Sequence, residues 1–382
     1  LTSGDVIDGG AGTDKVDVKV TGSTTTIAPR LTNVEEVAVQ FLGVNDTTVT
    51  LDLDTGDKLV TSLTITGTDE VTDEQAIVVK GIQTTDSVTL DTNMSTYTFD
   101  SVTLTYDSVT GTADTTSITV KDNLTDVVVA GIETLNVTTE KFVGTLTPED
   151  AETITITVGG TSTNTTTIAD IVQSSTDMAT LNLAGSGEAL TLTAGPEFKA
   201  NAVVNITNTG STSYTAKALT SANNTFTATG AAGKDTIDID LVTTGATISV
   251  TTNDGNDVVK LDQGVVTIDT GAGDDEVDAK QWAEVTSADS IDLGAGTADI
   301  VTSRDQIAID GSDVTTYGYF KNAEILKLSK ADVHFDINFN TFTSTNHIIL
   351  SGGIAASDHG TANNAGADQV DVTMNNDDIL EI

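Results

Sequence analysis

Apolar and hydroxyl residues alternate along much of this 382-residue chain. The alternation is clearest over residues 45–125, where 63–66, 86–90 and 100–104 each alternate Val, Leu or Ile with Thr or Ser. A period of two residues is the pattern of a half-buried β-strand. From about residue 177 the apolar stretches shorten and small-residue turns separate them, which is typical of a solenoid whose coils bury one another. The pattern predicts an all-β fold.

Helix signals are few in this sequence. Thr147 followed by Pro148 could cap and open a short helix over residues 147–150. Residues 168–174 and 322–331 are two further helix candidates.

A loose unit of the form apolar-Glu-x-apolar recurs along the chain. It occurs three times, within residues 33–39, 131–137 and 322–328. Each copy has the composition of a short strand. The repetition indicates that one structural module recurs along the chain.

A nine-residue interval appears in the second half of the chain. It separates the apolar residues Leu241, Val250, Val259, Ile268 and Val277. Ile291 and Ile300 repeat the interval, as do Ile7 and Val16. Nine residues is half of an eighteen-residue coil with two strands and two turns, and neither a helix nor a hairpin meander keeps this register. The interval therefore predicts β-strand-rich domains that lead into a right-handed parallel β-roll, a form of β-solenoid.

The turns between these strands are rich in Gly and Asp, as in residues 230–238 and 270–277. Glycine allows a positive φ and can turn backbone carbonyls inward. An Asp two residues before the apolar anchor adds a carboxylate, and turns eighteen residues apart, such as those of Asp257 and Asp275, stack around one gap. About six to eight hard oxygen ligands suit Ca²⁺. The turns therefore predict multiple Ca²⁺ sites.

The candidate ligands come from five such turns. They are Gly9, Gly10, Gly12, Asp14, Gly230, Gly233, Asp235, Asp254, Gly255, Asp257, Gly271, Gly273, Asp275, Gly294, Gly296 and Asp299. With Ile300 as its anchor, the fifth turn has Ala298 where the Asp belongs and Asp299 one residue late, which weakens that candidate. A salt-adapted acidic surface is the competing interpretation, but it predicts no nine-residue register.

Composition and charge narrow the functional classes. The chain has 57 Asp and Glu against 16 Lys and Arg, a net charge of −41. This balance excludes most nucleic-acid binders and docking on anionic lipid, because both need clustered Lys and Arg. Hydrophobic residues make up 37% of the chain, only 3 residues are Pro, and nearly a fifth are Thr. An ordered β protein is therefore expected rather than a disordered acidic chain.

Cysteine is absent, which excludes disulfides, thiol catalysis and Cys-ligated metals. No apolar run is long enough for a transmembrane segment. The chain starts at Leu1 without a signal peptide, and we expect it to be a fragment of a longer extracellular protein.

No catalytic motif is evident. His334, His347 and His359 form no His-Glu-x-x-His motif, and a Gly-x-Ser-x-Gly elbow does not occur. Carboxylates are too abundant for a pair to indicate a glycosidase, and 4% aromatic residues offer little surface for sugar stacking. The chain is therefore not expected to be an enzyme.

The Gly/Asp turns resemble the RTX nonapeptide, Gly-Gly-x-Gly-x-Asp-apolar-x, of calcium-binding parallel β-rolls. The resemblance covers residues 1–18 and about 229–302. Composition and the apolar-Glu-x-Leu strands are most similar to those of Gram-negative RTX surface-layer (S-layer) proteins. That resemblance implies type I secretion, a place at the cell surface, anchoring on lipopolysaccharide through a region outside this fragment, and self-assembly of this part into a calcium-dependent lattice.

Four segments are expected from the changes in pattern. They are a Thr-rich β domain over 1–145, a solenoid-like segment over 146–228, the calcium-binding β-roll over 229–305 and a C-terminal β segment over 306–382. The predicted function is structural, with Ca²⁺ completing the turns and driving assembly of an S-layer. An RTX adhesin segment and the calcium-binding accessory domain of a secreted hydrolase remain as alternatives.

Overall fold

A computed structural model describes most of the chain. The described residues are 2–21, 26–42, 48–67, 76–91, 100–109, 111–121, 124–140, 143–159, 166–173, 178–185, 189–215, 225–239, 246–261, 263–279, 285–307, 319–331, 334–338, 345, 347–350, 369–373 and 379–381. Two compact units divide them: unit 1 comprises residues 1–199 and 207–210, and unit 2 comprises residues 200–206 and 211–382. The four-segment division stays a prediction.

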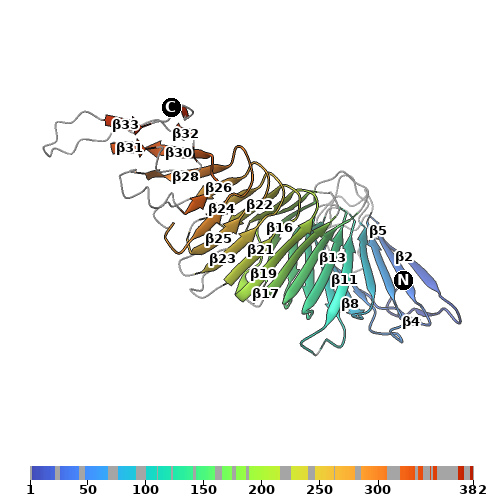
Figure 1. Ribbon diagram of the computed structural model, residues 1–382. Coiled ribbons are helices and arrows are strands. Elements are labelled where there is room, and N and C mark those ends of the chain that lie inside the picture. Colours follow the sequence, from blue (N-terminus) through green and yellow to red (C-terminus); the bar gives the residue numbers. More distant parts are fainter. Residues whose placement is uncertain are drawn as a thin grey trace, which may run out of the picture. The chain divides into compact units, whose positions relative to one another are not determined.

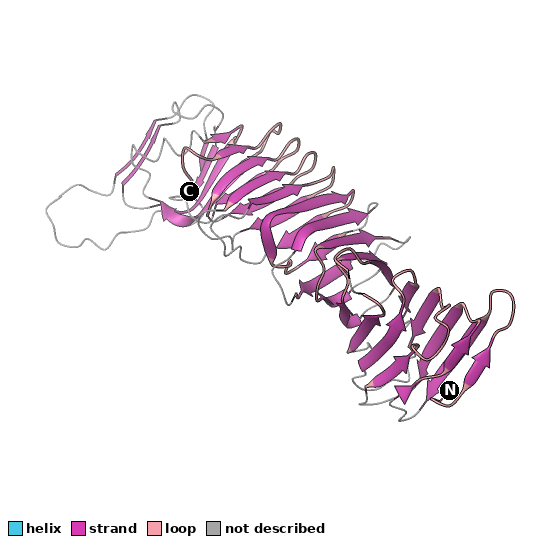
Figure 2. Cartoon of the chain, turned by 90° about the horizontal axis from the view of Figure 1, so that it is seen from below, coloured by secondary structure: helices cyan, strands magenta, loops and turns pink. Residues whose placement is uncertain are grey.

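Every described element is a β-strand, and the described residues contain no helix (Figure 2). Over most of its length the chain alternates between two sheets, so that a strand pairs in parallel with the strand two places later along the chain. The first three strands instead each pair with the strand three places later. Parallel pairing between strands of successive coils defines a β-solenoid, which confirms the predicted fold class. In the described part of the chain, no helix is long and apolar enough to span a membrane.

Unit 1 stacks its strands in two sheets, which we call odd and even after the strand numbers that each contains from β5 (Glu36–Leu42) onward (Figure 1). The odd sheet has, in order, β2 (Lys15–Thr21), β5 (Glu36–Leu42), β7 (Ser62–Thr66), β9 (Ser87–Asp91), β11 (Thr115–Val120), β13 (Thr134–Thr139), β15 (Thr153–Val158) and β17 (Met178–Gly185). The even sheet has β3 (Thr26–Ile27), β6 (Val49–Asp52), β8 (Ala76–Ile82), β10 (Ser101–Tyr106), β12 (Leu124–Ala130), β14 (Val143–Pro148), β16 (Thr166–Ile171) and β18 (Leu190–Leu192). A small third sheet pairs β1 (Val6–Asp8) with β4 (Arg30–Thr32).

Unit 2 repeats this alternation. Its odd-numbered strands are β19 (Phe198–Asn208), which crosses the unit boundary, β21 (Thr225–Thr229), β23 (Thr247–Thr251), β25 (Val265–Asp269), β27 (Ser290–Asp292) and β29 (Phe320–Lys321). Its even-numbered strands are β20 (Thr212–Thr215), β22 (Asp235–Ile239), β24 (Val258–Leu261), β26 (Glu276–Ala279), β28 (Ile300–Ile307), β30 (Ile325–Ala331), β32 (His347–Leu350) and β34 (Ile379–Glu381). A separate pair joins β31 (His334–Asn338) and β33 (Gln369–Thr373).

The strands β23 to β26 show how the sequence forms a coil. Thr247 pairs with Val265, and Val258 pairs with Glu276, so each residue lies beside the residue eighteen positions later. The predicted anchors Val250, Val259, Ile268 and Val277 are buried. Burial of one such side chain contributes about 1.5–3 kcal/mol, and repetition of the anchors builds a continuous core. The eighteen-residue coil is therefore confirmed here; Leu241 lies outside the described residues.

The three helix predictions are wrong. Thr147 and Pro148 end β14, residues 168–171 lie in β16, and residues 325–331 form β30. Ile168, Ile171 and Leu326 are buried in the core. Burial against neighbouring coils outweighs the weak local helix signals, and Pro is tolerated at the end of a strand.

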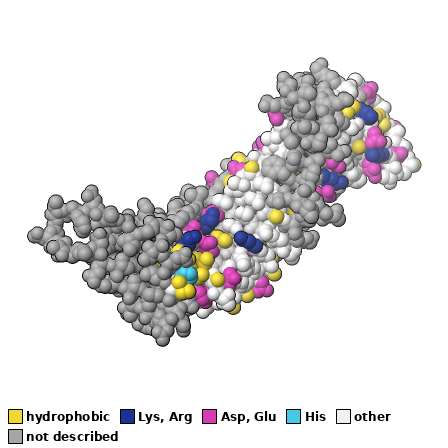
Figure 3. Space-filling model, turned by 90° about the horizontal axis from the view of Figure 1, so that it is seen from above, with side chains coloured by type: hydrophobic (Ala, Val, Ile, Leu, Met, Phe, Trp, Pro, Cys, Tyr) yellow, Lys and Arg dark blue, Asp and Glu magenta, His cyan; other side chains and the backbone are white. Residues whose placement is uncertain are grey.

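The surface carries its charge in small groups. Figure 3 shows acidic side chains scattered among uncharged polar side chains and backbone on one face. Along each strand Thr and Ser occupy many of the outward positions, as in β15, where Ile154 and Ile156 are buried and the intervening Thr residues are partly exposed. The sequence alternation thus becomes an apolar core and a hydroxyl-rich surface.

Candidate functional site

The Gly/Asp turns of unit 2 lie at one edge of the solenoid. The turns 230–235, 252–257, 270–275 and 293–299 each lead from an odd-numbered strand to the following even-numbered strand. Because successive even-numbered strands pair in parallel, their preceding turns stack on one another. This confirms that turns eighteen residues apart lie side by side.

A chain of hydrogen bonds joins the aspartates of these turns. The amide of Asp235 donates to Asp257 Oδ1, that of Asp257 to Asp275 Oδ1, and that of Asp275 to Asp299 Oδ1, each at 2.8 Å. The amide of Asp299 donates to Glu324 Oε2 at 3.0 Å. We call these five residues the acidic column. In each of these coils, one carboxylate oxygen therefore accepts a hydrogen bond from the backbone amide of the Asp one coil earlier.

The other oxygen of each aspartate is buried without a hydrogen-bond partner. These atoms are Asp235 Oδ1, Asp257 Oδ2, Asp275 Oδ2 and Asp299 Oδ2. The four residues are 0–1% exposed. The nearby hydroxyl of Thr252 cannot satisfy Asp257, because it donates its one hydrogen to the carbonyl of Thr270 at 3.0 Å. A buried carboxylate without a partner is costly unless a cation neutralises it.

The electrostatics of the acidic column disfavour four ionised carboxylates. Burial raises the pKa of Asp235 to about 7, and the carboxylate of Asp257 raises it further. Burial likewise raises the pKa of Asp257 to about 6 and that of Asp299 to about 7. Burial also raises the pKa of Asp275. Full ionisation of the column therefore costs free energy, although the charge of Lys234 offsets part of the cost at Asp257.

In the metal-free protein, the free energy of unfolding is expected to rise as the pH falls from about 8 to about 5. The folded-state pKa values of Asp235, Asp257 and Asp299 lie above the unfolded value, so the folded state binds more protons in this window. Urea unfolding in a chelator at several pH values measures the effect. Asp235→Asn should reduce this pH dependence and Asp254→Asn, at an exposed position of the next turn, should not; equal slopes in both variants contradict the assignment.

Glycines allow backbone carbonyls to approach closely beside the carboxylates. A Cβ on Gly255 would lie 2.5 Å from the carbonyl oxygen of Gly233 and 2.6 Å from Asp257 Oδ1. A Cβ on Gly273 would overlap the carbonyl oxygen of Gly255, and one on Gly296 would overlap that of Gly273. The carbonyl of each coil therefore points at the glycine of the next coil, where only hydrogen fits. A backbone carbonyl oxygen therefore lies against each of these three glycines.

The oxygen donors of these turns fit a hard cation such as Ca²⁺. Each coil supplies one buried carboxylate oxygen without a partner and a carbonyl oxygen in the adjacent turn. Among the described residues, no group of three or more His, Asp or Glu side chains could hold a metal by itself. Backbone carbonyls and water would therefore have to supply most ligands of each ion.

The fifth turn is in better register than its sequence indicates. Glu276 pairs with Ile300 and Val277 with Val301, so the anchor is Val301, which is fully buried. Asp299 therefore stands two residues before its anchor, as the motif requires, and the assignment of Ile300 as anchor is wrong. The shift arises because this turn has one more residue than the turn at 270–275, as the pairing of Ala272 with Ala295 shows.

The side chain of Asp274 accommodates the extra residue of the fifth turn. Its Oδ1 accepts the amides of Thr297 and Ala298, both at 3.1 Å. Asp274 itself donates its amide to Asn256 Oδ1 at 3.2 Å. An exposed polar row thus runs outside the acidic column and holds the turns together.

The remaining candidates of unit 2 differ in what they contribute. Gly271 and Gly294 have φ values of 89° and 80°, and Asn253 takes the equivalent place with φ of 68°. A Cβ on Gly230 would lie 2.5 Å from Asp235 Oδ2. Asp254 lies in its turn with an exposed side chain, apart from the acidic column.

The first turn, in unit 1, is a shorter version of the same arrangement. The amide of Asp14 donates to Glu35 Oε2 at 2.8 Å, and Asp14 Oδ2 is buried without a partner. A Cβ on Gly9 would lie 2.6 Å from the Cβ of Asp14. Gly10 and Gly12 have positive φ, with open space where a Cβ would stand.

A role for glutamate was not predicted from the sequence. Glu35, Glu133 and Glu324 accept the amides of Asp14, Asp114 and Asp299 at 2.8, 2.8 and 3.0 Å. Each is the Glu of an apolar-Glu-x-apolar unit. The three loose copies are therefore one structural device, in which a Glu receives the amide of the Asp one coil earlier. The recurrence of these units in the sequence was the signal that could have indicated a role for their glutamates.

Glu133→Ala is expected to lower the free energy of unfolding by about 1–3 kcal/mol, because it leaves the part-buried amide of Asp114 without its acceptor. Thermal unfolding measures the loss. Glu152→Ala, one coil later, is the matched control: Glu152 forms an exposed ion pair with Lys199, whose loss costs about 0–1 kcal/mol. Equal losses in the two variants would contradict a specific role for Glu133.

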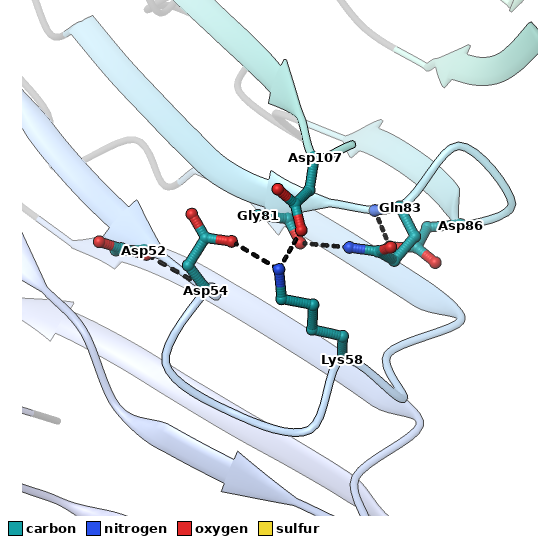
Figure 4. Close-up of polar contacts among 7 residues, drawn as sticks. All are labelled: Asp52, Asp54, Lys58, Gly81, Gln83, Asp86 and Asp107. Carbon is teal, nitrogen blue, oxygen red and sulfur yellow. Dashed lines mark hydrogen bonds and ion pairs between the residues drawn. The ribbon is translucent and has the colours of Figure 1, made fainter. Parts of the chain in front are cut away.

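A second acidic cluster, in unit 1, contains a lysine that pairs with two of its aspartates. Lys58 Nζ lies 3.2 Å from Asp54 Oδ1 and also contacts Asp107 Oδ2 (Figure 4). The hydrogen bond from Lys58 lowers the pKa of Asp107. Figure 4 also shows Gln83, whose backbone N–H donates to buried Asp86 Oδ2 at 2.7 Å.

No protein-family model, no curated protein and no solved structure matches this chain. The functional argument therefore rests on the residues and geometry described above.

Proposed function

We propose that this chain is a structural, calcium-dependent part of an extracellular surface layer. In this proposal Ca²⁺ binds at the Gly/Asp turns, completes the coils and allows copies of the chain to assemble into a two-dimensional lattice. The resemblance to RTX surface-layer proteins supports export by type I secretion and a place at the cell surface. The parallel β-solenoid fold is compatible with this function.

The acidic column carries the proposal. Four aspartates hold buried carboxylate oxygens without hydrogen-bond partners, and glycines leave room for carbonyl oxygens beside them. Because folding brings these carboxylates together, a cation that binds only the folded state also stabilises it. Ca²⁺ is favoured over Mg²⁺, because a donor set of carbonyls and single carboxylates has no rigid octahedral arrangement.

The test is addition and removal of Ca²⁺ on the purified chain, followed by circular dichroism and electron microscopy, with Mg²⁺ as the control ion. We expect Ca²⁺ to increase β structure and to produce two-dimensional sheets, and Mg²⁺ to do neither at the same concentration. Calcium-dependent folding with a strictly monomeric product would favour the adhesin or hydrolase-accessory alternatives. No response to Ca²⁺ in either measurement would overturn the proposal.

A further inference from the structure

The outward face of the odd-numbered sheet in unit 1 is unusual for so acidic a chain. We call the outward side chains of β7, β9, β11, β13, β15 and β17 the hydroxyl face. One column of it consists of Thr64, Thr89, Thr119, Thr138 and Thr157, which lie in register on successive strands. The neighbouring column contains only Ser, Asn and Thr.

The hydroxyl face is almost free of charge. Over β7 to β17 its outward positions carry Ser, Thr, Asn and Ala, with Asp91 at the end of β9 as the single charged side chain on these described strands. The even-numbered sheet of the same unit instead carries Asp52, Lys80 and Asp126. At a net charge of −41, two copies that approach through most surfaces bring carboxylates together. On the hydroxyl face that repulsion is weaker than on the even-numbered sheet of the same unit.

We propose that the hydroxyl face of unit 1 is the contact surface through which a second copy of this chain binds. The face is regular, because the register between β7 and β15 has no shift. Strands lie about 4.8 Å apart and alternate residues about 6.7 Å apart, so two such faces present the same grid of hydroxyl and methyl groups. Hydroxyls can donate and accept, which makes the face complementary to itself. The inference rests on the self-assembly part of the proposed function.

The size of the face predicts a weak contact. Six strands of about five residues cover roughly 24 by 17 Å, or about 400 Å² per copy. A pair would then bury about 800 Å², below the roughly 1,200 Å² of stable pairwise interfaces. Isolated dimers are therefore not expected to persist. Arrays, in which each copy makes several contacts at once, gain from the high local concentration.

Two triple variants of the full chain test the proposal. The face variant carries Thr64→Glu, Thr119→Glu and Thr157→Glu, on alternate strands of the odd-numbered sheet, so that the new charges are not direct neighbours. The control variant carries Thr50→Glu, Thr103→Glu and Thr147→Glu, at equally spaced, partly exposed positions of the even-numbered sheet. Both add the same charge to the same unit.

Sedimentation and electron microscopy in Ca²⁺ measure assembly, and calorimetric titration measures Ca²⁺ binding separately. We expect all three proteins to bind Ca²⁺ alike, while the face variant needs at least a tenfold higher concentration than the control to assemble. About 0.5 M NaCl should recover part of the loss, because salt screens the added charges. The inference is wrong if the two variants assemble equally, or if the wild-type chain binds Ca²⁺ without associating. Neither result would contradict calcium binding itself. If the wild-type chain does not bind Ca²⁺ at all, the proposed function is wrong.

Discussion

Asp257→Asn is expected to stabilise the metal-free protein and to destabilise the calcium-bound protein. Without Ca²⁺, the variant removes a buried carboxylate whose pKa is raised to about 6, and at pH 8 this should add about 1–3 kcal/mol to the free energy of unfolding. The amide oxygen of Asn can still accept the hydrogen bond from Asp235. With Ca²⁺, the variant loses a charged ligand, and the apparent affinity should fall by about 10- to 100-fold.

Thermal unfolding of wild type and variant, in chelator and in saturating Ca²⁺, measures both effects. Asp269→Asn is the control, because its exposed side chain lies at the end of β25 in the same unit and Asp269 is not a candidate ligand. It should change either state by no more than about 0.5 kcal/mol. If Asp257→Asn shifts stability in the same direction in both conditions, Asp257 is not a calcium ligand.

Gly273→Ala is the second change with a large expected effect. Gly273 has a φ of 147°, and a Cβ there would overlap the carbonyl oxygen of Gly255. The backbone conformation alone costs an L-residue about 1–2 kcal/mol, and displacement of the carbonyl adds to it. We expect a total loss of about 2–4 kcal/mol and weaker Ca²⁺ binding, because the displaced carbonyl is one of the proposed donors.

Gly12→Ala separates the two causes. Gly12 also has positive φ, at 129°, but open space surrounds its missing Cβ. Its replacement should therefore cost only the conformational part, about 1–2 kcal/mol. Denaturant unfolding of both variants gives the comparison. A loss in Gly273→Ala no larger than that in Gly12→Ala would show that the stacked carbonyl tolerates displacement.

The coil and its core were predictable because they depend on local periodicity. Val250 and Val259 are buried at the nine-residue interval that the sequence shows, and the turns between them carry the expected glycines. The assignment of Ile300 failed because its distance from Ile291 also happens to be nine residues. Only the pairing of Val277 with Val301 shows that the turn has an additional residue.

The acidic column was only partly predictable. Spacing identified Asp257 and Asp275 as neighbours, but it does not show which oxygen accepts the preceding amide and which stays unpartnered. Glu324 completes the column although it lies 25 residues after Asp299, outside any nine-residue register. Such a contact follows from the register of stacked strands, which varies with turn length. Short sequence motifs therefore identify Asp257 and Asp275 as neighbours but do not identify Glu324 as the last member of the column.

A calorimetric titration of Ca²⁺ tests the central claim most directly. It compares the wild-type chain with a variant in which Asp235, Asp257, Asp275 and Asp299 are all replaced by Asn, with circular dichroism to verify that the variant is folded. The account predicts that the wild type binds several Ca²⁺ ions per chain. The folded variant should bind fewer ions, because it lacks those that the acidic column binds in the wild type. A folded variant that binds as many ions with the same affinity as the wild type would contradict it.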